Sequence, residues 1–112
     1  DLQTKDGQWS RAKGFDTFCP LGHWIETDFF PGNQKIEAVV NGEVKQSSTL
    51  DQMIFNVPRI VNFISSVMTL LPGDVIITGT PSGIGPMPEG AQVSLSIEGL
   101  GTLTNKVSTR AK

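Results

Sequence analysis

The chain has 112 residues and a mass of 12.1 kDa, which is one domain at most. A net charge of −2 and a pI of about 5.2 argue against a nucleic-acid or anionic-membrane binder, because either would need a basic face. No apolar stretch approaches the roughly 20 residues of a membrane span. The one cysteine cannot form an internal disulfide, so we expect a reducing cytoplasm.

The first third of the chain shows no clean hydrophobic period, and residues 1–34 are expected to be irregular, with a turn at Asp6-Gly7. Residues 36–40 are expected to form a strand. Asn41-Gly42 then predicts a type I′ hairpin into a second strand, because both residues tolerate the positive φ of that turn.

One helix is expected near residues 57–70. Asn56 can cap it, Pro58 suits its first turn, and apolar residues recur with helical spacing along one stripe. The sequence Leu-Pro-Gly-Asp at 71–74 ends the helix. The apolar run Val-Ile-Ile-Thr at 75–78 then predicts a strand that is buried on both faces.

A glycine- and proline-rich loop is expected at 79–90. Apolar and polar residues alternate at 93–97, which is typical of a half-buried strand, and a turn at 99–101 leads into a last strand at 102–107. The predicted fold class is therefore mixed α+β and β-rich, with one helix and at least five strands. Charged residues make up only 18%, against a usual share of about 25%, so part of the surface is expected to face another segment.

Two pairs of side chains suggest a catalytic or a metal site, but neither pair completes one. Cys19 and His23 are four residues apart, but nothing nearby supplies the orienting third group that a thiol nucleophile needs. We interpret them as a small buried thiol beside a loop histidine. Glu26 and Asp28 would share one face of an extended segment and offer half of a cation site, although two solvated acids are the preferred interpretation.

The loop at 79–90 lacks the Lys-Ser/Thr pair of a phosphate-binding P-loop, which argues against a nucleotide site. Its glycines expose backbone N–H groups, and Thr78 and Thr80 add hydroxyls, so it is suited to hold a small carboxylate. A plain connection is the alternative. Lys13, just ahead of Phe15 and Phe18, is either an oxyanion partner or base, or a surface lysine.

Four segments together resemble the fumarylacetoacetate hydrolase family, in the family's order and spacing over essentially all of 1–112. They are QWSRAKGFDTFCPLG, VNGEV, DQMIF with the helix and LLPGDVIITGTPSGIGP, and EGLGTLTN. The resemblance implies a β-roll fold, here partial, a homodimer, and a divalent cation, Mg²⁺ or Mn²⁺. Members act on acylpyruvate-type or other 2-oxo acids through an enolate-like species that the metal stabilises.

The resemblance also implies roles for individual residues. Gln3 matches a substrate or water contact, Lys13 the active-site lysine that stabilises an oxyanion, and Thr80 the threonine that binds the substrate carboxylate. The family's metal ligands, a Glu-x-Glu pair and an aspartate, would all precede Asp1. The chain therefore resembles the C-terminal portion of a single catalytic domain, which needs its N-terminal portion or a companion chain and is expected to be inactive alone.

The implied activity is that of a cytoplasmic hydrolase or decarboxylase of acylpyruvate-like or 2-oxo acids. One alternative is an isomerase of the 2-hydroxyhepta-2,4-diene-1,7-dioate type from the same family. The other is a catalytically incomplete half-domain that acts only through interactions with another segment or chain.

Overall fold

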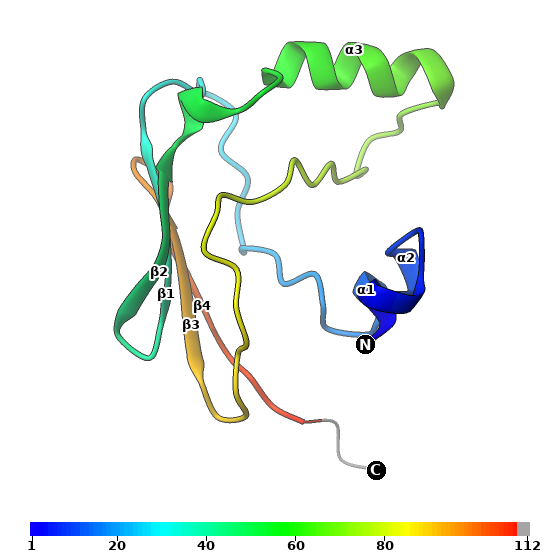
Figure 1. Cartoon of the computed structure of the whole chain (residues 1–112). Helices are drawn as coiled ribbons and strands as arrows, with labels where there is room; N and C mark the ends of the chain where they lie inside the picture. The colour runs from blue at the N-terminus through cyan, green and yellow to red at the C-terminus, as the bar shows by residue number, and fades with distance from the viewer. Residues whose placement is uncertain (110–112) are drawn as a thin grey trace.

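The structure, a computed structural model, describes residues 1–109. Its largest unit is one β-sheet, and its helices stand apart from that sheet (Figure 1), so the mixed α+β class is confirmed. In chain order the elements are α1 (Leu2–Lys5), α2 (Ser10–Lys13), β1 (Lys35–Val40), β2 (Glu43–Thr49), a 3₁₀ turn η1 (Leu50–Gln52), α3 (Val57–Val67), β3 (Gln92–Ile97) and β4 (Gly101–Lys106).

The sheet is antiparallel, with the strand order β2-β1-β3-β4. The β1–β2 hairpin turns at Asn41-Gly42, where φ is 51° and 82°, as the sequence predicts. The β3–β4 hairpin turns through residues 98–100. Between the two hairpins, β1 pairs with β3, and Ile36 lies opposite Ile97. This central pairing joins segments that are far apart in the sequence.

The two faces of the sheet differ in polarity because successive side chains of a strand point to opposite sides. The strand pairing places on one face the apolar residues Ile36, Ala38, Leu95, Ile97 and Leu103. On the other face, Lys35 Nζ lies 2.7 Å from Glu37 Oε1, and the hydroxyls of Ser94 and Thr104 lie 2.9 Å apart. The alternation at 93–97 therefore predicts the sheet correctly.

Helix α3 begins where the sequence predicts. The Asn56 side-chain oxygen accepts a hydrogen bond from the Arg59 N–H at 3.0 Å, and Pro58 lies in the first turn. The helix ends at Val67, three residues before the expected end. Its apolar stripe is covered only in part by the rest of the described chain: Ile60 and Ile64 are half-buried, whereas Val67 and Met68 are 64% and 59% exposed. Figure 1 shows α3 extending away from one end of the sheet.

The strand expected at 75–78 is wrong, and the described chain has four strands rather than five. The segment is irregular, and Val75 and Ile77 are exposed. An apolar, β-branched run becomes a strand only when a neighbouring strand pairs with it. The described residues bring no such partner to this segment.

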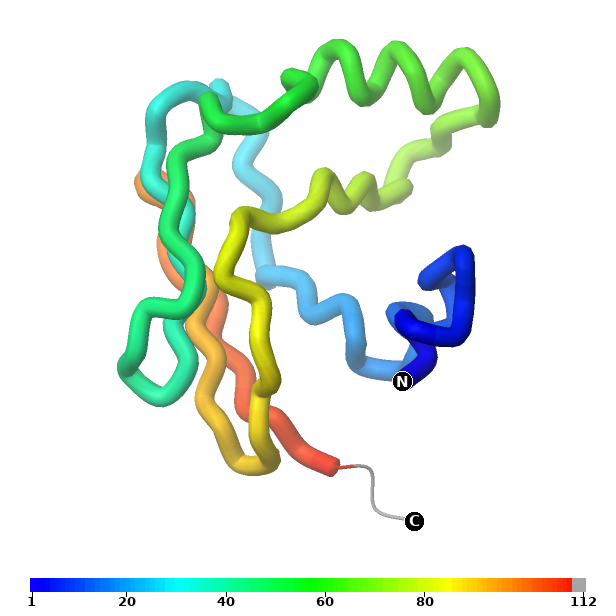
Figure 2. Tube along the Cα trace, in the orientation of Figure 1, coloured from blue at the N-terminus to red at the C-terminus, as the bar shows by residue number. Residues whose placement is uncertain are grey.

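The described residues do not pack into a compact unit. The buried apolar residues among them are two alanines, Ala38 and Ala91. The accessible surface is 9478 Å², whereas a folded monomer of this mass exposes about 6,000 Å². The radius of gyration of 15.5 Å likewise exceeds the ~13 Å of a compact chain of this length. Figure 2 shows α3 and the N-terminal helices standing off the sheet on long irregular segments. In residues 1–109 no helix is long and apolar enough to cross a membrane.

Candidate active site

A cavity of about 500 Å³ lies against the apolar face of the sheet. Its floor includes Ile36, Ala38 and Leu95, and its walls come from two irregular segments, 22–29 and 79–81. Aromatic rings of the first segment lie over the β3–β4 hairpin: a Cβ on Gly101 would lie 3.9 Å from Cζ2 of Trp24, and one on Gly99 would lie 3.6 Å from Cε2 of Phe29. The second segment belongs to the glycine-rich loop that the sequence predicts.

Gln46 on β2 holds this glycine-rich loop against the sheet. Its Nε2 lies 2.9 Å from Thr80 Oγ1 and 2.6 Å from the carbonyl oxygen of Pro81, so it donates to both. Gly83 follows with φ of 101°, and a Cβ on it would overlap the carbonyl oxygen of Lys45. The loop therefore meets β2 at two neighbouring residues, one through a side chain and one through its backbone.

Strand β2 is irregular where the glycine-rich loop lies against it. The register between β1 and β2 shifts between Ala38, which lies opposite Gln46, and Val39, which lies opposite Val44. Lys45 is therefore the extra residue of a β-bulge, and bulges re-aim neighbouring groups of a strand. The bulge lies next to Gln46, the residue that binds the loop.

Thr80 lines the cavity, whereas Thr78, which directly precedes the loop, does not, although both residues are exposed. The sequence predicts both hydroxyls at the end of a strand. That strand is absent from the described residues, and the Gln46 hydrogen bonds locate Thr80 instead. Thr80 is thus the sequence-predicted site residue that the structure brings into the cavity.

Gln3 and Lys13 lie on α1 and α2, outside the cavity lining. Arg11 joins these helices through two hydrogen bonds to Asp6, from Nη2 at 2.7 Å and from Nε at 3.0 Å. The Lys13 ammonium lies 5.1 Å from the centroid of the Trp9 ring, a cation–π contact. The structure therefore joins Gln3 and Lys13 in one helical unit but does not bring that unit to Thr80 (Figure 1).

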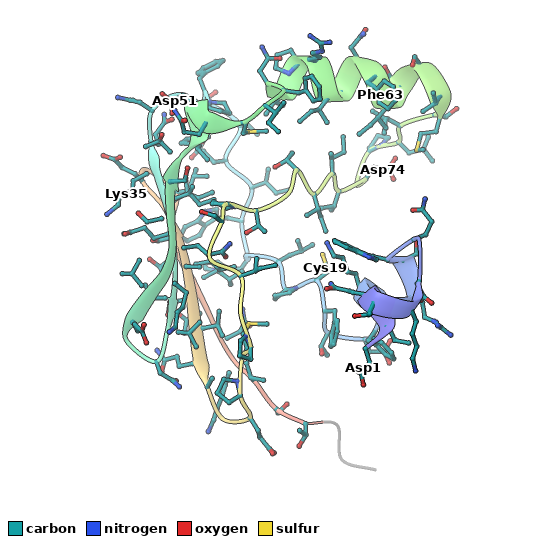
Figure 3. The ribbon with its side chains drawn as sticks, viewed as in Figure 1. Asp1, Cys19, Lys35, Asp51, Phe63 and Asp74 are labelled. Carbon is teal, nitrogen blue, oxygen red and sulfur yellow. The ribbon has the colours of Figure 1, made fainter. Side chains whose placement is uncertain are left out.

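The other candidates from the sequence are placed separately. Cys19 is exposed, so its expected burial is wrong: it lies in an irregular segment on the side of the N-terminal helices (Figure 3), where the described chain offers no packed layer. His23 lines the cavity and meets the Trp24 ring edge-on, with centroids 4.3 Å apart. Glu26 and Asp28 are exposed, as expected of solvated acids, and Glu26 accepts a hydrogen bond from the Asp28 N–H.

Acidic groups near the cavity do not form a cation site within residues 1–109, where no three or more His, Cys, Asp or Glu residues converge. The described part of this chain therefore does not fit a bound divalent cation by itself. Glu26 lines the cavity, whereas the Glu37 carboxylate lies on the opposite, polar face of the sheet, where the hydrogen bond from Lys35 holds its pKa below the ordinary value.

Comparisons with known proteins agree with this geometry. Residues 1–108 match the family described as fumarylacetoacetate (FAA) hydrolase C-terminal. The chain belongs to the fumarylacetoacetate hydrolase family. A Mycobacterium tuberculosis protein is 55% identical over 100% of this chain, which covers 43% of that protein. The mitochondrial oxaloacetate decarboxylase of Dictyostelium discoideum is 43% identical over 89% of this chain, which covers 46% of it.

Solved structures of this family have the same fold. The crystal structure of 5-carboxymethyl-2-hydroxymuconate delta-isomerase from Mycobacterium smegmatis aligns with a TM-score of 0.96 and 54% identity, over 100% of this chain and 45% of the isomerase. Maleylpyruvate hydrolase from Sphingobium sp. SYK-6, in complex with manganese(II) and pyruvate, aligns with a TM-score of 0.80 and 35% identity, over 84% of this chain and 37% of the hydrolase. The chain thus spans less than half the length of each of these four relatives.

Gln46 is the residue of this site that sequence reasoning missed. It lies in a strand whose pattern indicates a hairpin, 34 residues before Thr80. Nothing local marks it, because its contact with the loop depends on how distant segments cross. The resemblance points to Thr80 but not to the residue that holds it.

Proposed function

We propose that this chain is the C-terminal portion of a catalytic domain that hydrolyses or decarboxylates acylpyruvate-like or other 2-oxo acids. Breaking a C–C bond next to such a group leaves an enolate-like species, whose negative charge must be stabilised. The related enzymes named oxaloacetate decarboxylase and maleylpyruvate hydrolase support this substrate class. The observation that carries the proposal is the Thr80 hydroxyl at the cavity wall, held by Gln46 beside a glycine-rich backbone.

In this proposal Thr80 binds the substrate carboxylate. Lys13 stabilises the oxyanion through its positive charge, and Gln3 contacts the substrate or a water molecule. Hydrogen-bond donors aimed at developing negative charge supply a large part of catalysis in many enzymes. The Arg11–Asp6 ion pair supports the proposal because it fixes the two helices that carry Gln3 and Lys13 relative to each other.

The proposed enzyme uses Mg²⁺ or Mn²⁺, but the described residues do not supply the ligands for this cation. The manganese(II) in the related maleylpyruvate hydrolase supports a divalent cation. Its ligands are proposed in a portion that precedes Asp1. We also propose a homodimer, and a chain that is inactive without its N-terminal portion. The cytoplasm remains the proposed compartment, although the Dictyostelium relative is named mitochondrial.

A second candidate is isomerisation of a 2-hydroxyhepta-2,4-diene-1,7-dioate-type acid. It is favoured by the structural match to an isomerase from Mycobacterium marinum of that name, at 56% identity and a TM-score of 0.95. Both candidates require a held carboxylate and a stabilised enolate, so Thr80 and Lys13 keep the same roles. They differ in whether a carbon–carbon bond breaks.

The test is a substrate panel on the full-length protein with Mg²⁺, with Mn²⁺ and after chelation. Oxaloacetate, an acylpyruvate and a 2-hydroxyhepta-2,4-diene-1,7-dioate are supplied in turn, and products are separated by chromatography and identified by mass spectrometry. We expect pyruvate with carbon dioxide or a second acid, which are cleavage products. A product of unchanged mass would support the isomerase instead. Conversion of none of the acids would contradict both and favour the half-domain alternative.

A further inference from the structure

The two hydrogen bonds of Gln46 decide which way the Thr80 hydroxyl can donate. The carbonyl oxygen of Pro81 can only accept, so the Gln46 atom that lies 2.6 Å from it must be the amide nitrogen. The same nitrogen lies 2.9 Å from Thr80 Oγ1. Gln46 therefore donates to the hydroxyl as well, and the Thr80 oxygen acts as the acceptor in that contact.

A hydroxyl has one proton and two lone pairs. Because the Gln46 amide occupies a lone pair of Thr80, the hydroxyl proton is left for an acceptor in the cavity that Thr80 lines. An ionised carboxylate is such a group, since its oxygens only accept hydrogen bonds. Accepting one hydrogen bond also polarises a hydroxyl and strengthens the bond that it donates.

Gln46 is well placed to hold this orientation. It belongs to a strand of the sheet, it is half-buried, and it lies opposite Ala38, one of the two buried alanines. Its second hydrogen bond, to Pro81, fixes the amide, so that the group cannot turn its oxygen toward Thr80 without losing that bond. One side chain thus sets both the position and the donor direction of the loop hydroxyl.

We propose that Gln46 is a positioning residue that presents Thr80 as a hydrogen-bond donor to the substrate carboxylate. The proposal rests on the carboxylate-binding role proposed above for Thr80 and extends it to a residue on the sheet. Gln46 also lines the cavity, and in this proposal it acts on the substrate through Thr80. The competing explanation is that Gln46 merely anchors the loop through Pro81.

The experiment measures pyruvate affinity by calorimetry on the full-length protein with Mg²⁺ present. Gln46→Met, which keeps the size but removes both donors, is made in three backgrounds: native Thr80, Thr80→Ser and Thr80→Ala. Gln92→Met, the matched control, makes the same change at an exposed glutamine of the same sheet. Melting temperatures of all variants are recorded alongside.

We expect Gln46→Met to weaken pyruvate binding about tenfold in the native and Thr80→Ser backgrounds, the scale of one lost hydrogen bond. In the Thr80→Ala background it should have no further effect, because no hydroxyl remains to be oriented. The control should leave affinity unchanged. If Gln46→Met does not fold, Gln46→Asn takes its place, since its shorter side chain cannot span both acceptors.

Equal losses in the serine and alanine backgrounds would overturn the proposal in favour of a loop anchor. No loss in the native background would overturn it outright, while leaving the role of Thr80 intact if Thr80→Ala still weakens binding. Unchanged affinity in Thr80→Ala alone would instead refute the carboxylate contact of Thr80, and the role of Gln46 with it. The affinities of these variants therefore distinguish a failure of the Gln46 proposal from a failure of the Thr80 proposal.

Discussion

Gly83 and Lys45 approach so closely that a Cβ on Gly83 would overlap the carbonyl oxygen of Lys45. The glycine also has φ of 101°, which side chains disfavour. Both the backbone conformation at position 83 and the space around it therefore favour glycine. Because the contact follows Thr80 by three residues, it limits how the cavity loop lies on β2 and thereby where the Thr80 hydroxyl lies.

Gly83→Ala in the full-length protein should lower the melting temperature and raise KM for a 2-oxo acid about tenfold or more, because the loop must move off β2. Gly73→Ala is the matched control: Gly73 lies outside the cavity lining and has φ of 97°, but nothing lies within 4 Å of an added Cβ. It should show only backbone strain, on the order of 1 kcal/mol. Equal effects of the two substitutions on KM would contradict the importance of the Lys45 contact.

Thr80→Ala should raise KM for a 2-oxo acid about tenfold, since a hydrogen bond to a charged group contributes roughly 1.5–3 kcal/mol and part of it is replaced by water. Thr80→Ser keeps the hydroxyl and should stay within about threefold of the native KM. Steady-state kinetics on the full-length protein measure both. An unchanged KM in the alanine variant would argue against a carboxylate contact.

Lys13→Met should lower kcat by about 10²-fold or more, the scale of losing one donor to an oxyanion. The reason is that methionine fills the space of lysine without its charge. Lys5→Met makes the same change at the exposed end of α1 and should leave kcat nearly unchanged. Near-native turnover of Lys13→Met would refute the role proposed for this lysine.

The 112-residue chain expressed alone should self-associate or bind a hydrophobic dye. Its sheet has apolar residues on a face that the described chain covers only in part, and most of the apolar stripe of α3 is exposed. Light scattering and dye fluorescence measure this. A monomer that binds no dye and unfolds cooperatively would show that the chain is self-sufficient.

The same isolated chain should bind Mg²⁺ no better than a weak surface site would. The described residues bring no three cation-ligating side chains together, and a hard cation needs several converging oxygen ligands. Calorimetry on the isolated chain, with the full-length protein as the positive control, tests this. Specific micromolar binding by the isolated chain would contradict it.

Local chemistry made three parts of the fold predictable. Asn41-Gly42 determines its turn through positive φ, and Asn56 caps α3 through a hydrogen bond within its own turn. The alternation at 93–97 indicates which side of β3 is apolar. In each case the residues that decide the structure are neighbours in the sequence, so their pattern is sufficient.

Two expectations failed because they concern partners at a distance. Apolarity at 75–78 predicts burial, yet a strand needs another strand and a buried face needs another layer, and the described chain supplies neither there. Cys19 is exposed for the same reason. Composition shows that a residue is suited to an interior but not whether another segment covers it.

The sequence by itself therefore determined the family, the two hairpins and the capped helix, and it drew attention to Thr80, because these depend on short motifs. Only the tertiary structure decided what holds Thr80. The amide of Gln46 and the carbonyl of Lys45 reach the loop from 34 and 38 residues away, across a β-bulge. Such contacts arise when the sheet places distant segments side by side, so no local pattern encodes them.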